Sequence, residues 1–397
     1  MFESIYVGLT GLTAFSRNLT VIGNNVTNVD SPGFKGSRLD FSDLVYNSLV
    51  AGGDGTRLLA GNGVQASESR VLFKQGTLNQ TGNATDVAID GNGFFVLRQD
   101  GATTYSRGGN FQFDANGVLV AASGAHVAAL AGGALQDFDI ASLRVSPPHA
   151  TSVLHFTDNL SSGGTSQDVS ATLFDAAGGN SAVTVHFTNN GATTPGSWLV
   201  EVRNSAGSAI ANGEIRFNGD GSPAAGFNSM SFAFTPSAAP AQQVTLDFGP
   251  AGGFSGATNF SAGTTSTLKL GSQDGFGPGA LTSTSFDRDG VLQASYSNGQ
   301  SAQGPRLALA FFGSPQELTP AGGSAFENAS GQAVVLGGAR VGVFGAIAGQ
   351  TLEAANVDLG TEFGDLIITQ RGYQASSQVI TTANDMIQQL FDIRSKG

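Results

Sequence analysis

The two ends of this chain follow a helical pattern, and the long middle does not. Residues 1–31 and 351–397 contain no proline, and their apolar residues recur at steps of three and four. The residues between them are rich in Gly, Ser, Thr and Asn and predict strands joined by turns. An amphipathic helix has to bury its apolar face against another element. We therefore expect the two ends to pair and the β-rich middle to project, an arrangement that suits assembly better than catalysis.

The first helix is defined by a stripe of apolar residues on one face. The stripe consists of Ile5, Leu9, Leu12, Phe15, Leu19, Ile22, Val26 and Val29. Pro32 and Gly33 follow the stripe and are expected to end the helix. Residues 34–70 are less regular and predict a connection with a short amphipathic segment, which a glycine-rich run at 52–55 interrupts.

The last helix carries two series of residues at seven-residue spacing. One series is apolar and consists of Leu366, Tyr373, Ile380 and Ile387. The second core series consists of Phe363, Gln370, Ser377, Asn384 and Phe391, of which three are polar. Polar residues at core positions fix register and partner number, or else they face a wet surface.

Glycines weaken both terminal helices. Gly8, Gly11 and Gly23 lie in the first helix, and Gly364 and Gly372 lie in the last. Each costs about 1 kcal/mol relative to alanine in a helix interior. The sequence therefore predicts that the helices pair as a coiled coil but become stable only on assembly.

A short repeat indicates how the β-rich middle is organised. Residues 113–119 and 286–292 share the pattern Phe-Asp-x-x-Gly-Val-Leu, and both predict strand, turn, strand. The run Asp-Gly-Asn-Gly at 90–93, between apolar residues 87–89 and 94–97, predicts a β-hairpin. The two copies of the repeat lie about equally far from the chain ends, which suggests one β domain built from both sides of an insertion.

The predicted fold class is therefore multidomain α+β, with paired terminal coiled-coil helices and two largely antiparallel β domains, the second inserted into the first. Pro147 and Pro148 open the insertion, whose short strands alternate with turn residues as in a sandwich or barrel. The predicted segments are a first helix, a connecting segment, a β domain made of two parts, an inserted outer β domain and a last helix. Their bounds are 1–33, 34–70, 71–146 plus 284–356, 147–283 and 357–397.

Composition excludes several classes of protein. The net charge of −12 argues against binding to nucleic acid, whose phosphates require a basic surface. The chain has no cysteine, and therefore no disulfide or thiolate site. The N-terminus lacks the basic and apolar regions of a cleaved signal peptide. The longest uncharged apolar stretch, 118–135, is mostly Ala and Gly, so we expect no membrane insertion.

The residue types that serve in catalysis or metal binding form no recognisable motif in this sequence. The four histidines, His126, His149, His155 and His186, have no metal-ligand spacing. The Asp287 loop lacks most ligands of a calcium loop and predicts an ordinary turn. We therefore expect no catalytic residue, no metal and no cofactor. A secreted, β-rich, glycan-active enzyme stays open as an alternative, because paired carboxylates meet only in space.

Four segments resemble the conserved motifs of the bacterial flagellar rod and hook axial proteins. The run NNVTNVDSPGFK at 24–35 is similar to the motif that follows their first helix, and TGNATDVAIDGNGFF at 81–95 is similar to their β-domain motif. LEAANVDL at 352–359 and QRGYQA at 370–375 resemble their C-terminal motifs, with Ala355 and Ser376 as departures from the usual Ser and Asn. The motifs occur in the family's order, and the central insertion matches none of them.

The resemblance implies a structural protein, not an enzyme. Length and the insertion favour the hook branch of the family, whose subunits form a helical homopolymeric tube that acts as a universal joint between motor and filament. It implies export through the flagellar type III apparatus and a location outside the cell, in the hook and basal body. The implied partners are further copies, a hook cap protein, a hook–filament junction protein and the distal rod protein. A distal-rod-like protein of the same family stays open as an alternative.

Assembly residues follow from the helical patterns and from the motifs of the resemblance. We expect contacts in the polymer from Leu9, Leu12, Leu19, Ile22, Asn25, Val26, Asn28, Gly33, Phe34, Asn356, Asp358, Phe363, Leu366, Arg371, Tyr373, Gln374, Ile380 and Ile387.

Overall fold

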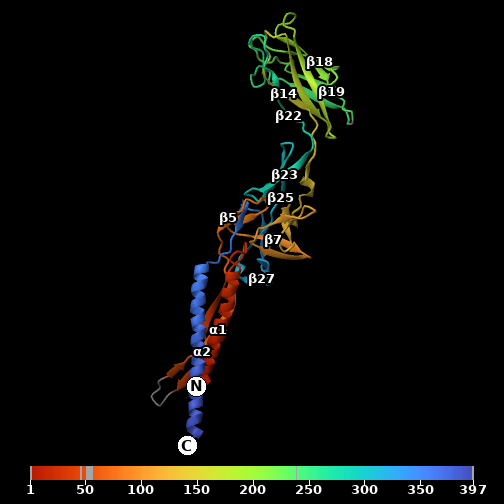
Figure 1. Cartoon of the computed structure of the whole chain (residues 1–397). Helices are drawn as coiled ribbons and strands as arrows, with labels where there is room; N and C mark the ends of the chain where they lie inside the picture. The colour runs from red at the N-terminus through yellow and green to blue at the C-terminus, as the bar shows by residue number, and fades with distance from the viewer. Residues whose placement is uncertain (1, 45–46, 51–56, 238, 396–397) are drawn as a thin grey trace. The chain divides into compact units, whose positions relative to one another are not determined.

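The computed structural model describes residues 2–44, 47–50, 57–237 and 239–395. It is mostly β, with one long helix at each end: α1 spans Phe2–Thr27 and α2 spans Leu359–Ser395 (Figure 1). This confirms the prediction of terminal helices around a β-rich middle. The chain divides into two compact units. The first unit comprises Met1–Ala141, Thr284–Gln293 and Gln303–Gly397, and the second comprises Ser142–Ser283 and Ala294–Ala302.

Helix α1 ends five residues before Pro32. The amide of Asn28 donates to the carbonyls of Asn24 and Asn25, and the Asn28 side chain also donates to Asn24 O. A side chain that competes for backbone groups in this way favours a turn over a further helical residue. Val29, which was expected in the helical stripe, therefore lies in the turn that follows α1.

The connection after α1 is a β ribbon, and part of the predicted short amphipathic segment lies on its first strand. Strands β1 (Ser37–Asp43) and β4 (Val64–Val71) pair antiparallel, and β2 (Asn47–Val50) pairs with β3 (Arg57–Ala60). Apolar residues at every second position, Leu39 and Phe41, suit a strand better than a helix. Leu39 and Ala66 pack on Ala14 of α1. The predicted glycine break at 52–55 falls outside the described residues.

The main sheet of the first unit has ten strands in the order β27-β28-β8-β7-β11-β10-β9, with β12, β26 and β29 paired to its members. Their bounds are β7 Phe94–Gln99, β8 Ala102–Ser106, β9 Gln112–Phe113, β10 Leu119–Val120, β11 His126–Ala131, β12 Ala134–Asp137, β26 Leu309–Phe312, β27 Thr319–Gly322, β28 Ala325–Glu327 and β29 Val334–Gly337. Two small sheets pair β5 (Leu78–Gln80) with β31 (Thr351–Glu353) and β6 (Val87–Asp90) with β30 (Ala346–Gly349). A short 3-10 helix spans Pro315–Glu317.

The predicted hairpin around residues 90–93 was wrong. Among the described residues β6 pairs with β30, whereas β7 pairs with β8, β11 and β26, so the turn leads from one sheet to another. Gly91 and Gly93 both have positive φ, of 112° and 128°. Their carbonyls accept hydrogen bonds from the Arg107 guanidinium instead of serving a strand pair.

The two copies of the repeat do form strand, turn, strand. The first copy joins β9 to β10, and the second joins β23 (Gly279–Phe286) to β24 (Val291–Tyr296). In each turn the aspartate carboxylate accepts backbone N–H bonds: Asp114 from Asn116, Gly117 and Val118, and Asp287 from Asp289 and Val291. Strands β13 (Val145–Ser146) and β25 (Ser301–Arg306) complete this four-stranded sheet, and a 3-10 helix spans Ala141–Leu143.

The second unit contains two sheets around one core. One sheet has the order β15-β16-β17-β18, and the other has the order β19-β20-β14-β21 with β22 paired to β14. Their bounds are β14 Val153–Asn159, β15 Ser166–Phe174, β16 Asn180–Asn189, β17 Ser197–Asn204, β18 Ala209–Arg216, β19 Ser229–Phe234, β20 Gln242–Asp247, β21 Ala257–Thr258 and β22 Lys269–Gln273. Inward residues of both sheets, such as Trp198 and Phe156, share one hydrophobic cluster. This is the packing of a β-sandwich.

Candidate assembly site

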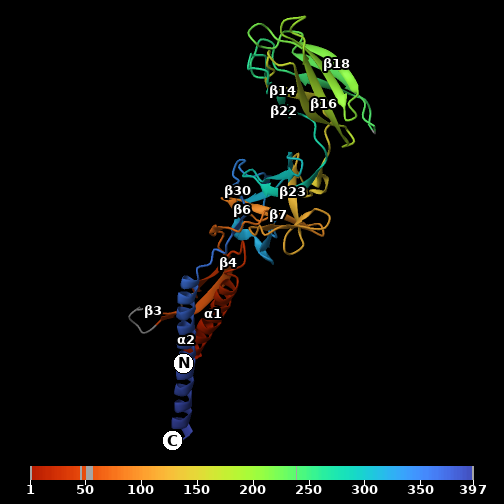
Figure 2. The same ribbon diagram turned by 45° about the horizontal axis from the view of Figure 1, so that its top comes forward.

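Helices α1 and α2 lie side by side in opposite directions (Figures 1 and 2). Their closest approach is lined by glycines. A Cβ atom on Gly8 would lie 2.7 Å from Ile380 Cγ1, one on Gly11 would lie 2.6 Å from Ser376 Oγ, and one on Gly372 would lie 2.5 Å from the Phe15 ring. These glycines therefore let the two backbones approach closely, in addition to lowering intrinsic helix stability.

Two polar contacts continue this interface toward the β strands. Asn18 Nδ2 donates to Thr369 Oγ1 at 2.9 Å, and Asn25 Nδ2 donates to Glu362 Oε1 at 3.0 Å. Burial raises the pKa of the Glu362 carboxyl, although the Asn25 bond opposes this shift. Both contacts, like those of the glycines, join residues whose numbers sum to about 387. This constant sum defines the register of the pair.

The expected assembly residues are distributed over three environments. Ile22, Asn25 and Gly33 are buried. The half-buried ones are Leu12, Leu19, Val26, Asn28, Phe34, Asn356, Leu366, Ile380 and Ile387. The exposed ones are Leu9, Asp358, Phe363, Arg371, Tyr373 and Gln374.

The α2 face toward α1 differs from the predicted pair of core series. Three members of the apolar series are half-buried, but Tyr373 is exposed, and all five residues of the second series are exposed. The positions that complete the covered face are the small residues Thr369, Ser376 and Ala383. Small side chains fit here because Gly8 and Gly11 bring the α1 backbone close.

A further apolar stripe of α2 has no cover within the described chain. We call it the α2 stripe, and it consists of Ile368, Val379, Met386, Leu390 and Ile393. Their exposed fractions lie between 44% and 72%. At 3.6 residues per turn these five side chains fall within about 60° of one another, centred about a quarter of a turn around the helix from the face that packs on α1. An exposed apolar stripe of this length is typical of a surface that binds another protein.

Motif residues fasten both helices to the β strands of the first unit. The Asn25 side chain exchanges two hydrogen bonds with the backbone of Ser37, at 2.8 and 2.9 Å. Asn356 accepts from Gly36 N and donates to the carbonyls of Leu72 and Lys74. Gly33 has φ +69°, and a Cβ there would lie 2.1 Å from Gly108 N, so glycine is required at this position.

Asp358 caps α2. Its Oδ1 accepts from Thr361 N at 2.8 Å, the bond expected of an N-cap residue. The backbone bond from Thr361 lowers the pKa of this exposed carboxyl. The motif thus sets the first residue of α2.

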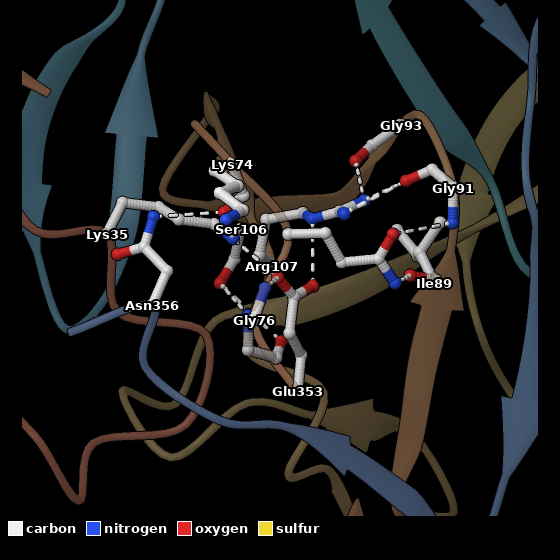
Figure 3. A network of polar contacts seen from close by, with 12 residues as sticks. Lys35, Lys74, Gly76, Ile89, Gly91, Gly93, Ser106, Arg107, Glu353 and Asn356 are labelled. Atoms are coloured by element: carbon white, nitrogen blue, oxygen red, sulfur yellow. Dashed lines mark hydrogen bonds and ion pairs between the residues drawn. The ribbon is translucent and has the colours of Figure 1, made fainter. Parts of the chain in front are cut away.

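A buried cluster of three charged side chains joins the two ends of the chain (Figure 3). Lys35 Nζ bonds Glu353 Oε1 at 2.5 Å and donates to Lys74 O at 2.9 Å. Arg107 Nε lies 3.0 Å from Glu353 Oε2 as an ion pair, and its terminal nitrogens donate to the carbonyls of Gly91 and Gly93. The Lys35 and Glu353 side chains are fully buried. We call this set the charge cluster.

Burial and charge oppose each other in the charge cluster. Desolvation lowers the pKa of Lys35 and of Arg107, while the Glu353 carboxylate raises both. Because one carboxylate serves two cations, its removal leaves two buried positive charges. The cluster was not predicted from the sequence. Lys35 lies in the motif at 24–35 and Glu353 in the motif at 352–359. A charged residue within each motif is the signal by which the sequence could have indicated the cluster.

Three of the four histidines form ordinary pairs with aspartates. His126, His155 and His186 each bond one aspartate on a neighbouring strand. Among the described residues no group of three or more His, Asp or Glu is arranged to hold a metal ion. In the same residues, neither helix has the length and apolar content needed to cross a membrane.

Comparison with known proteins agrees with this architecture. Residues 5–35 match the family described as flagella basal body rod protein, residues 88–155 match the flagellar hook protein FlgE/F/G D1 domain, and residues 348–393 match the flagellar basal body rod FlgEFG protein C-terminal family. The flagellar hook protein FlgE of Treponema pallidum is 31% identical over 99% of this chain and 100% of that protein. Those of Borreliella burgdorferi and Escherichia coli are 28% and 29% identical, over 100% and 97% of this chain and 100% and 98% of those proteins. The chain therefore belongs to the flagellar hook protein family.

Proposed function

We propose that this chain is the repeating subunit of the bacterial flagellar hook, a helical tube of identical copies that transmits motor torque to the filament as a flexible joint. The observation that carries the proposal is the α2 stripe, which is covered by nothing in the described chain. Further copies of the same chain would bury it. The role is structural and requires no catalytic residue, metal or cofactor.

The terminal helices would form the assembly core as a coiled coil. The steps of three, four and seven between contacting positions, from residue 8 to 25 on α1 and from 362 to 380 on α2, support this packing. Exposed apolar residues and helix glycines make the single chain's helices weak. We therefore infer that the helical pair becomes fully ordered only in the polymer.

The β units would form the outer part of each subunit. We infer that residues 147–283 are a domain inserted into the β domain formed by 71–146 and 284–356. Ion pairs of the second unit, such as Glu201–Arg203 and Glu214–Arg216, lie at its surface and join neighbours in sequence. A surface without buried ion pairs between copies can slide at low free-energy cost, as bending and rotation of a joint require.

The family implies further partners for the subunit. We infer export by the flagellar type III apparatus, growth beneath a hook cap protein, attachment to the distal rod protein and connection to the filament through a junction protein. The hook at the basal body, outside the cell, is the location in which these partners meet.

Electron microscopy of the purified full chain at high concentration tests the proposal. The unmodified chain should form tubular polymers. The double variant Ile368→Asp, Ile393→Asp should remain monomeric, because it places charges on the α2 stripe. The matched control Gln370→Asp, Gln388→Asp adds the same charges on another side of α2. Polymers of normal length from the stripe variant, or monomers alone from the unmodified chain, would refute the proposal.

A further inference from the structure

A groove runs along α1 beside strand β4. Its first part, a hollow of about 330 Å³, is lined among others by Tyr6, Leu9, Thr13, Arg17 and Ala66. Its second part, of about 530 Å³, shares Arg17 and Ala66 and continues past Val21 to Ser69. Tyr6 and Leu9 are each 54% exposed. We call this hollow the α1–β4 groove, and it lies wholly within the first unit.

We propose that the α1–β4 groove receives the α2 stripe of a second copy of this chain. The inference rests on the proposed function, because it names the surfaces through which copies of the subunit meet. A helical polymer has heterologous contacts, in which one surface of a subunit binds a different surface of the next. The stripe and the groove are two such surfaces. Tyr6, Leu9 and Ala66 give the first part of the groove apolar lining, whereas polar side chains such as Arg17 and Glu68 line the second part. An amphipathic helix laid into a groove is a common mode of protein recognition.

The last part of the α2 stripe extends beyond the α1 helix of its own chain, so a second copy is the better partner for it. In the register of the helical pair, Phe2 lies opposite Asp385, since the numbers of opposed residues sum to about 387. Leu390 and Ile393 therefore have no described residue of α1 opposite them, and they are 52% and 72% exposed.

Charge complementarity fixes a register for the docking. Arg17 lines both parts of the groove, and among the described residues it has no ion pair. Asp385 flanks the stripe, about 100° around α2 from Met386, and likewise has no ion pair among the described residues. Pairing Arg17 with Asp385 gives a sum of 402, and the same sum places Ile393 opposite Leu9. One register thus forms the ion pair and also brings Ile393, the most exposed residue of the stripe, opposite Leu9 of the groove.

This register predicts how far neighbouring copies are displaced. Copies in a polar helical polymer point the same way, so α2 of one copy runs antiparallel to α1 of the next. The sum changes from 387 within a chain to 402 between chains, which is 15 residues. At 1.5 Å per residue the displacement along the helix axis is about 22 Å.

Cysteine cross-linking in the full chain tests the docking, because the chain has no cysteine of its own. Thr13→Cys with Leu390→Cys should give a ladder of disulfide-linked multimers in oxidised polymers. Within one chain these positions are about 24 Å apart along the helices, too far for a disulfide. The control Thr13→Cys with Gln388→Cys moves the second cysteine to the far side of α2 and should link at least about tenfold less.

Charge exchange gives a second measurement. Arg17→Asp and Asp385→Arg should each weaken polymerisation about two- to fivefold, as expected for loss of one exposed ion pair, and the double variant should recover most of that loss. Polymers in which the Thr13 and Leu390 cysteines do not link, or in which Leu390→Cys alone links equally well, would overturn the docking. If the unmodified chain forms no polymer, both the proposed function and the docking fail. If it forms polymers that lack the cross-link, only the docking fails, so the two failures are distinguishable.

Discussion

Glu353 bonds Lys35 across 318 residues of sequence, and both side chains are excluded from solvent. This pair joins the segment that follows α1 to the strand that precedes α2. Arg107 places a second cation on the same carboxylate. An ion-pair network thus connects the segment after α1 with the segment before α2, where the helices meet the β strands of the first unit.

Replacing Glu353 should destabilise the first unit strongly. Glu353→Gln keeps the shape but leaves the Lys35 and Arg107 side chains buried without a counter-ion. Breaking a buried ion pair in this way costs about 3–5 kcal/mol. Denaturant unfolding of the full chain, followed by circular dichroism, measures the loss.

The exposed pair Arg340–Asp289 supplies the control for that experiment. Both side chains are at least half exposed, so Asp289→Asn should lower the free energy of unfolding by no more than about 1 kcal/mol. An equal effect of the two variants would show that the charge cluster contributes no more than a surface pair.

Two glycines of α2 should respond to alanine in opposite directions. A Cβ at Gly372 would lie 2.5 Å from the Phe15 ring, whereas nothing lies within 4 Å of a Cβ at Gly364. Gly372→Ala should weaken the helical pair by about 1–3 kcal/mol through overpacking, and Gly364→Ala should stabilise α2 by up to about 1 kcal/mol. Helical content during thermal unfolding distinguishes them, and equal stabilisation by both would contradict the close approach of α1 and α2.

The cap of α2 should weaken in acid. The pKa of Asp358 is lowered in the folded chain, so its stabilising effect is present above the ordinary value of 3.8 and is lost as the pH falls through the folded value. The Thr361 amide, which donates to Asp358 Oδ1, should report this loss by NMR during a titration from neutral to acid pH. In Asp358→Asn the amide still has an acceptor but should lose the pH dependence, and an unchanged titration in that variant would exclude Asp358 as its source.

The single tryptophan should tolerate replacement better than its burial suggests. Trp198 is fully buried, and its indole N–H has no hydrogen-bond partner among the described residues. Trp198→Phe loses volume but removes the unpaired donor, whose burial costs about 1–3 kcal/mol. We expect a net loss below about 1 kcal/mol, measured as the free energy of unfolding by circular dichroism.

Phe187 offers the matched control for Trp198. It is equally buried in the same cluster but carries no polar atom. Phe187→Leu should therefore cost more than Trp198→Phe, because only the cavity changes. A larger loss for Trp198→Phe would show that the indole N–H is satisfied in solution.

Residue spacing predicted two kinds of element correctly: long helices, and turns whose hydrogen bonds join nearby residues. The terminal helices and the two turns of the repeat follow from spacing alone, because a helix and an Asx turn are decided by nearby residues. The run at 90–93 failed, since it has the composition of a hairpin turn while the Arg107 guanidinium, outside the run, binds both glycine carbonyls. Residue spacing cannot report a partner of that kind.

The assembly residues stay a prediction, and the structure reports only how exposed they are in the single chain. Leu366, Ile380 and Ile387 of the apolar series on α2 are half-buried, whereas all five residues of the second series are exposed. Close packing at Gly8 and Gly11 selects small residues on the α2 face toward α1 instead of the large and polar ones at heptad positions. The charge cluster depends on contacts between residues hundreds of positions apart, which no local pattern contains.

The connectors at 33–36 and 353–356 also decide how the first unit bears force. Gly33 N donates to Glu353 O, Asn356 N donates to Phe34 O, and Gly36 N donates to the Asn356 side chain. Tension applied along the helices would reach the bonds between these two connectors before it reached the strands beyond them. Several bonds would then have to break together before either connector could be pulled away. A subunit fastened in this way resists mechanical extraction far better than one held by a single extended linker.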